Sequence, residues 1–135
     1  MRAAIDTGAL LALANPRDQY HEAARRIARD FLAGGGRFVG TTLVLAELHG
    51  HLLRRVDAPR AAAVLRAVLT DRGYEWHDAT TELVDAALGG WIARFDDQRF
   101  SLTDAVTFEL MRRERLTDAF AFDEHFTLAG FRLLP

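Results

Sequence analysis

The segments 101–106 (SLTDAV) and 119–126 (AFAFDEHF) decide how we interpret this chain. The first has the composition of a helix start, because Ser101 can cap a helix and Asp104 then lies in its first turn, where a carboxylate is stabilising. The second begins as an apolar run of strand length, which Asp123 terminates. Carboxylates at helix starts and strand ends are typical of the ligand-binding edge of an open α/β sheet.

Two more acids occupy positions that point to the same edge. Asp6 follows the apolar segment 2–5 and precedes a short helix, whereas Glu47 lies on a predicted helix among apolar neighbours. A carboxylate beside a buried stripe is costly unless it is paired, hydrogen-bonded or bound to a metal. Each acid alone has a simpler explanation, as a helix cap, a turn residue, a helix-dipole partner or an exposed edge residue. Four acids on four separate elements favour a common site over these explanations.

Four clustered carboxylates suit a hard divalent cation such as Mg²⁺ or Mn²⁺. Two such ions about 3.5–4 Å apart can activate a water molecule and stabilise the leaving oxygen when a phosphodiester is cleaved. Without an ion, the clustered charges would raise pKa values within the group. The histidines offer no rival site, because His49 and His51 point in different directions on a helix. Only His125 is expected near the acids, with a surface turn as the alternative.

Short apolar segments alternate with amphipathic segments of helix length along the whole chain. We expect strands at 2–5, 37–40, 74–77, 119–122 and 131–134. We expect helices at 9–14, 18–33, 42–56, 59–72 and 81–95, and one that begins near 102. The apolar stripe of the second helix contains Tyr20, Ala24, Ile27 and Phe31. This alternation predicts an α/β fold with a parallel sheet covered on both faces.

The composition is that of one globular domain, 1–135. Half of the residues are hydrophobic and 27% are charged, and 135 residues are enough to bury a core. No apolar run reaches the roughly 18 residues of a membrane span, and the start reaches Asp6 too early for a secretory signal. We therefore expect a cytoplasmic protein without membrane contact. Because there is no cysteine, disulfides and thiolate metal sites are excluded.

The net charge of −2 is unlike that of most nucleic-acid-binding proteins. If four of the 19 acids lie in a metal site, however, the rest of the chain carries 17 basic and 15 acidic residues. All 17 basic residues are arginine, which codon usage in a GC-rich genome explains as well as phosphate binding does. The candidate RNA contacts are Arg112, Arg113 and Arg115, followed by Arg54 and Arg55, with solvated helix faces as the alternative.

Five short segments, in their order and spacing, resemble the PIN-domain family and within it the VapC-type toxins of prokaryotic toxin–antitoxin pairs. The segments are 5–11 (IDTGALL), 41–48 (TTLVLAEL), 101–106 (SLTDAV), 122–126 (FDEHF) and 130–131 (GF). Together they span nearly the whole chain. The resemblance implies a single three-layer α/β/α domain with a central parallel sheet of four or five strands.

The resemblance also implies an endoribonuclease that depends on Mg²⁺ or Mn²⁺. The family's catalytic and metal-binding acidic quartet carries over to Asp6, Glu47, Asp104 and Asp123. Thr7 and Thr103 stand where the family often has a hydroxyl that helps to orient the metal-binding side chains. Many members have Thr-x-Asp-x-Asp-Phe at the last motif, whereas this chain has Ala121 and His125 in place of the threonine and the second aspartate.

Toxins of this type usually form homodimers and are inhibited by a small antitoxin whose tail covers the acidic pocket. The resemblance therefore implies an RNA substrate, a cognate antitoxin and a homodimer. One alternative is a catalytically inactive PIN-like domain that is retained for partner binding or RNA binding. A magnesium phosphotransferase of the haloacid-dehalogenase or receiver type is disfavoured, because both rely on a lysine, which this chain lacks, and the former also needs a second aspartate where Gly8 stands.

Overall fold

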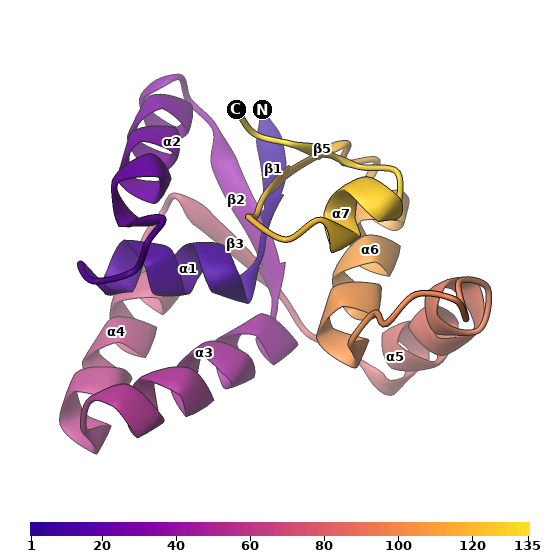
Figure 1. Cartoon of the computed structure of the whole chain (residues 1–135), viewed down its shortest axis with the longest axis horizontal. Coiled ribbons are helices and arrows are strands. Elements are labelled where there is room, and N and C mark those ends of the chain that lie inside the picture. The colour runs from indigo at the N-terminus through magenta and orange to yellow at the C-terminus, as the bar shows by residue number, and fades with distance from the viewer.

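The computed structural model describes all residues, 1–135, and contains a five-stranded parallel sheet with helices on both faces (Figure 1). The strands are β1 (Arg2–Ile5), β2 (Arg37–Thr41), β3 (Tyr74–His77), β4 (Asp118–Phe120) and β5 (Arg132–Leu133). The helices are α1 (Thr7–Ala14), α2 (His21–Ala33), α3 (Thr42–Arg55), α4 (Ala58–Thr70), α5 (Thr81–Ala87), α6 (Leu102–Glu114) and α7 (His125–Leu128), with a π-helical turn, η1 (Leu88–Ile92), directly after α5. The predicted α/β class is confirmed.

The strand order β3-β2-β1-β4-β5 places the start of the chain in the middle of the sheet. The chain builds outward from β1 to β3 and then crosses back, so that β4 lies on the other side of β1. Ligands of such sheets bind beyond the carboxyl ends of the strands where the order reverses, which here is between β1 and β4. At this point the backbone N–H of Asp6 donates to the carbonyl of Phe120 (3.1 Å). The topology therefore joins the residues that follow β1 and β4.

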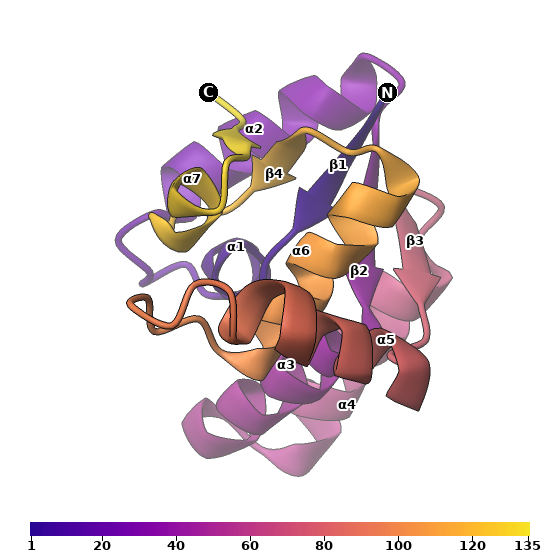
Figure 2. The same cartoon turned by 90° about the vertical axis from the view of Figure 1, so that its right-hand side faces the viewer.

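Side chains that alternate along the strands divide the core into two halves. Ala3 and Ile5 pack toward α1, α2, α3 and α4, whereas Ala4 packs toward α5, η1, α6 and α7. Figure 1 shows the first group of helices to the left of the sheet and the second group to the right, and Figure 2 looks onto α5 and α6. This is the three-layer arrangement that the family resemblance implies. None of the helices combines the length and the apolarity that crossing a membrane requires.

Helix α2 begins at His21, three residues later than predicted. Two side-chain turns precede it, because Asn15 accepts from the N–H of Arg17 (3.0 Å) and Asp18 accepts from the N–H of Tyr20 (2.8 Å). Such turns offer the backbone an alternative to the helix. The assignment of Tyr20 to the apolar stripe of α2 was therefore wrong. Its side chain is partly exposed instead of packing with the stripe.

Helix α5 also ends earlier than the predicted helix 81–95. The chain widens into η1, where the N–H of Ala93 donates to the carbonyl of Leu88, five residues back (2.9 Å). The widened turn holds Trp91 against α6, where its indole N–H donates to the buried carboxylate of Glu109 (3.1 Å). A π-helical turn contains one residue more than an α-helical turn. Hydrophobic periodicity does not reveal this extra residue, because the pattern on either side remains helical.

Candidate active site

The four predicted acids line one cavity of about 620 Å³. Asp6 lies between β1 and α1, and Asp123 lies three residues beyond β4. Asp104 is in the first turn of α6, and Glu47 is in the second turn of α3. Each acid therefore comes from a different part of the sequence, and the parallel topology brings all four to the carboxyl end of the sheet.

The start of α1 connects two of the acids. Asp6 has extended backbone angles and caps the helix, because its Oδ1 accepts from the N–H of Thr7 (2.7 Å). The hydroxyl of Thr7 is buried and donates to Oε1 of Glu47 (2.9 Å). Thr7 thus orients a carboxylate on another helix, which is the kind of role that the resemblance implies. Thr103, the other predicted hydroxyl, is buried in the first turn of α6 beside Asp104.

His125 connects the other two acids. Its backbone N–H donates to Oδ1 of Asp123 (2.9 Å), and its Nδ1 lies 3.1 Å from Oδ2 of Asp104 and 3.5 Å from Oδ2 of Asp123. The edge of the imidazole packs against the ring of Phe100, with 5.4 Å between ring centroids. The structure therefore places His125 among the acids rather than on a surface turn.

Clustering shifts the pKa values of these groups. Loss of hydration, followed by the charges of Asp104, Asp123 and Glu47, raises the pKa of Asp6 to about 7. Loss of hydration also raises the pKa of Asp104, whose side chain is 12% exposed, although the hydrogen bond with His125 opposes this shift. Burial alone would lower the pKa of His125, but the hydrogen bond with Asp104 and the neighbouring acids outweigh it and raise the pKa. The cluster is short of positive charge.

The residues that line the cavity fit a hard divalent cation. Ligand atoms of Asp104, Asp123 and His125 lie within 4.8 Å of one another, and Asp6 and Glu47 line the same cavity. Mg²⁺ and Mn²⁺ prefer carboxylate oxygens, and a bound cation would favour the charged form of Asp6 whose pKa is otherwise raised. Both the chemistry of the ligands and their electrostatic strain therefore point to the same kind of occupant.

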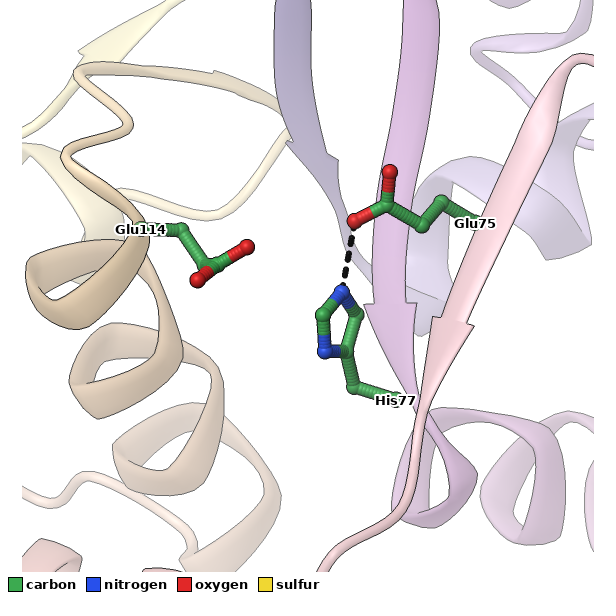
Figure 3. Close-up of side chains that lie close together, drawn as sticks. All are labelled: Glu75, His77 and Glu114. Carbon is green, nitrogen blue, oxygen red and sulfur yellow. Dashed lines mark hydrogen bonds and ion pairs between the residues drawn. The ribbon is translucent and has the colours of Figure 1, made fainter.

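A second group of possible metal ligands, Glu75, His77 and Glu114, lies between β3 and the end of α6 (Figure 3). His77 Nε2 lies 2.6 Å from Glu75 Oε2. The guanidinium of Arg2 donates to Oε2 of Glu75 (2.5 Å) and to Oε1 of Glu114 (2.9 Å), and Arg37 lies 3.6 Å from Glu75. Arginine therefore already supplies the positive charge, and we interpret the group as an ion-pair network that ties the start of β1 to β3 and α6.

The structure places the predicted RNA-binding arginines away from the acids. Arg112 and Arg113 are in the last turn of α6, about 12 Å along the helix axis from Asp104, which is in the first turn. Both pair with the buried Glu109, and Arg113 also pairs with Glu82 (2.6 Å). An RNA-binding role for these arginines, and for the exposed Arg115 that follows them, stays a prediction.

Several side chains at the cavity were not predicted from the sequence. Arg55 lines it from the end of α3, and Arg99 lines it from the loop before α6. Tyr20 and Phe122 line it as well, from the turn before α2 and from the loop after β4. Only Arg55 had a sequence signal, as part of the second arginine pair. The others reach the cavity through loops, whose course is not set by periodicity.

The parallel sheet, its helical layers and the carboxylates beyond β1 and β4 define a protein of the PIN class. No protein-family profile matches the chain. The 23S rRNA-specific endonuclease VapC20, from two strains of Mycobacterium tuberculosis, is 31% identical over 127 residues, which cover 94% of this chain and 93% of the relative. The chain therefore belongs to the VapC-type ribonuclease toxins of the PIN-domain family.

Solved structures show the same similarity. The crystal structure of VapC20 from M. tuberculosis, described as a toxin that cleaves the sarcin–ricin loop, has a TM-score of 0.84 at 29% identity and covers 96% of this chain and 95% of its own. VapBC2 from Rickettsia felis has a TM-score of 0.70 at 14% identity, covering 98% and 97%. FitAcB from Neisseria gonorrhoeae has a TM-score of 0.69 at 10% identity, covering 100% and 97%. The last two are similar in fold.

Proposed function

We propose that this chain hydrolyses phosphodiester bonds of RNA with Mg²⁺ or Mn²⁺ held by Asp6, Glu47, Asp104 and Asp123. The observation that carries this proposal is the convergence of the four carboxylates in one cavity, where the pKa of Asp6 is raised to about 7. A bound divalent cation supplies a nucleophilic water at neutral pH and stabilises the charge on the leaving oxygen. The protein's own contribution is to hold the carboxylates close together at the carboxyl end of the sheet.

The side chains around the quartet have distinct supporting tasks in this proposal. Thr7 holds Glu47 in position through its hydroxyl (2.9 Å). His125 holds Asp104 and Asp123 together, and its raised pKa means that it carries a positive charge more readily than a free histidine when no cation is bound. We assign Thr103, which is buried in the same helical turn, to supporting the position of Asp104. The complete quartet favours a working enzyme over a catalytically inactive domain.

Ribosomal RNA is the substrate class that we propose. The support comes from the relative that is named a 23S rRNA-specific endonuclease, which is 31% identical along 94% of this chain. Two exposed arginines, Arg55 and Arg99, line the cavity and are suited to contact the phosphates on either side of the cleaved bond. Arginine is effective here because its planar guanidinium binds phosphate oxygens in a bidentate manner.

We also propose a cognate antitoxin, a homodimer and a cytoplasmic site of action. These follow from membership of the VapC-type toxins, whose activity has to be restrained in the cell that makes them. An antitoxin that presents an arginine to the cavity would supply the positive charge that the carboxylates lack. Size-exclusion chromatography with light scattering of the chain, alone and with its antitoxin, tests both assemblies.

The activity is tested by incubating purified protein with ribosomes and total RNA in Mg²⁺, followed by sequencing of the new 5′ ends. Asp6→Asn and Asp104→Asn should each abolish cleavage, and excess chelator should do the same. Asp85→Asn, which changes an exposed carboxylate on α5, is the matched control and should cleave like the wild type. Cleavage that persists in both quartet variants or in chelator would falsify the proposal.

A further inference from the structure

Two aromatic rings form a stack at the side of the acidic cavity. The rings of Tyr20 and Phe122 are 4.5 Å apart between centroids and only 4° from parallel. Both line the cavity with the four acids, and Phe122 directly precedes Asp123 in the chain. The aromatic stack therefore lies in the same cavity as the carboxylates, and one of its rings is the sequence neighbour of Asp123.

The inner ring of the stack is anchored in the protein core. Phe122 packs edge-on against Phe120, with 6.0 Å between centroids and an interplanar angle of 70°, and Phe120 is fully buried at the end of β4. Phe120 in turn packs against Phe38 of β2, with 5.1 Å between centroids. The position of Phe122 is therefore set by the sheet, and so is the plane in which Tyr20 lies.

The outer ring is held in place but left open to solvent. Tyr20 is 42% exposed, and the ring of Phe122, which stacks on one of its faces, is its only aromatic partner. The side chain of Asp18 accepts from the backbone N–H of Tyr20 (2.8 Å), which holds the turn before α2. The aromatic side chain of Tyr20 is thus partly open to solvent beside strongly polar groups, although its helical spacing would suit the buried apolar stripe of α2.

Nucleobases are the ligands that suit such a surface. Unpaired bases of RNA stack on exposed aromatic side chains, and every base has a π face that can do so. The neighbouring groups fit the rest of a nucleotide, since Arg55 and Arg99 can contact phosphates and the carboxylates can hold the cations that bridge them. A purely apolar ligand would match the aromatic face but would leave the arginines and the acids without partners.

We propose that the open face of Tyr20 is a stacking platform for an unpaired nucleobase next to the phosphodiester that is cleaved. The inference rests on the proposed ribonuclease function and adds a recognition element to it. A base stacked on Tyr20 would hold the adjacent RNA backbone over the carboxylates. The platform would therefore favour RNA in which a base is unpaired and turned out of the helix. Tyr20 acts in substrate binding and positioning, and it takes no part in proton transfer.

The test compares Tyr20→Leu, which keeps an apolar side chain but removes the ring, with Tyr20→Phe, which keeps the ring. Both are made in the Asp6→Asn background, so that the RNA stays intact, and thermal unfolding of each variant checks the fold. The probe is a stem-loop RNA with the sarcin–ricin loop sequence, in which single loop bases are replaced in turn by fluorescent 2-aminopurine or by an abasic nucleotide. A mixed-sequence single-stranded RNA serves as the second probe.

We expect Tyr20→Leu to bind the loop RNA about tenfold more weakly and to lose the quenching of one 2-aminopurine position, whereas Tyr20→Phe retains both. An abasic nucleotide at that position should weaken binding to the Tyr20 protein by a similar factor and leave Tyr20→Leu unaffected. Equal affinity of Tyr20→Leu and the parent for both RNAs, or no quenching at any 2-aminopurine position of the loop RNA, overturns the platform. Failure of the wild type to cleave RNA would overturn the proposed function instead, because these binding measurements do not depend on cleavage.

Discussion

The hydroxyl of Thr7 donates to Oε1 of Glu47 across 40 positions of sequence, at 2.9 Å. This hydrogen bond joins the first residue of α1 to the second turn of α3 and connects two of the four carboxylate positions, because Thr7 also donates its backbone N–H to Asp6. A single buried residue therefore helps to align two acids. Hydrogen bonds of this kind around metal ligands often matter nearly as much as the ligands themselves.

Replacing this hydroxyl should weaken cation binding. Thr7→Val keeps the volume of the side chain but leaves Glu47 without its donor, so we expect the affinity for Mn²⁺ to fall about tenfold or more. Isothermal titration with Mn²⁺ measures the change. Thr7→Ser retains a hydroxyl and should stay within about twofold of the wild type. If Thr7→Val binds Mn²⁺ with the same affinity as the wild type, the hydroxyl of Thr7 has no role in cation binding.

The stability of the metal-free protein should fall as the pH rises from about 4 to 7. The pKa of Asp6 is about 7 in the folded state, against 3.8 for an aspartate free in water, so the folded state binds more protons than the unfolded state within this window. The charged form is therefore disfavoured by folding, at a cost of up to about 4 kcal/mol above pH 7. Urea unfolding at pH 5 and pH 8 measures the effect.

Asp6→Asn should flatten this pH dependence, because asparagine caps α1 as aspartate does but does not ionise. The variant should consequently be more stable than the wild type at pH 8 in the presence of chelator. Asp85→Asn, on the exposed face of α5, should keep the wild-type pH dependence. If Asp6→Asn loses as much stability as the wild type when the pH is raised, ionisation of a group other than Asp6 causes the pH dependence.

A divalent cation should reverse this destabilisation. Cation binding to the folded state alone stabilises it by about 2.7 kcal/mol at a concentration 100 times the dissociation constant. The affinity should be lower at pH 6 than at pH 8, because Asp6 must lose its proton to bind the ion. Differential scanning fluorimetry with Mn²⁺ at both pH values measures the shift, and Asp104→Asn should abolish it. A shift that is independent of pH would contradict the assignment of the raised pKa to Asp6.

The salt dependence of RNA binding should depend on the arginines at the cavity. Removing one phosphate contact reduces the slope of log K against log salt by about 1, so Arg55→Gln and Arg99→Gln should each flatten it. Arg112→Gln and Arg113→Gln test the contacts expected from the sequence, and we expect smaller changes because both side chains are paired with Glu109. Filter binding from about 50 to about 300 mM salt distinguishes the two groups of variants by the slope of log K against log salt. The opposite ranking would return the RNA-binding role to α6.

The buried carboxylate of Glu109 should stabilise the fold without serving the cavity. Glu109 is 4% exposed and accepts from Trp91, Arg112 and Arg113, and the hydrogen bonds from the two arginines help to lower its pKa to about 2. Glu109→Gln should cost about 2 kcal/mol of unfolding free energy at pH 7 while RNA cleavage persists. Because the pKa is lowered, this contribution is present above about pH 4.5 and is lost as the pH falls toward 2. Glu82→Gln, whose side chain is 68% exposed, should cost less in the same urea titration.

Much of the fold follows from local properties of the sequence. The strands 2–5 and 74–77 were predicted with the bounds that the structure shows, because each is a short segment between two segments of helix length. Asp6 directly follows the first of these strands, and Asp123 follows the apolar run that begins at Ala119, and parallel strands share one carboxyl edge. Asp6 and Asp123 could therefore be assigned to one edge of the sheet from the sequence alone.

Other features were decided only by contacts between distant parts of the chain. Tyr20 fits the helical spacing of α2, yet a turn stabilised by Asp18 removes it from that helix and stacks it on Phe122. The π-helical turn around Trp91 depends on the same kind of distant partner, since Glu109 on α6 receives the indole N–H. Loops and inserted residues carry no periodic signal, so their positions depend on which partners the fold brings near.

The amino-acid sequence by itself thus determined the α/β class, the order of its elements and the four acids at their ends, because these depend on periodicity and on the shared direction of parallel strands. Tertiary structure alone decided which further side chains surround the acids, including Arg99 and the Tyr20–Phe122 stack. It also determined the pKa of Asp6, because that value depends on the loss of water and on charges that lie up to 117 positions away in the sequence.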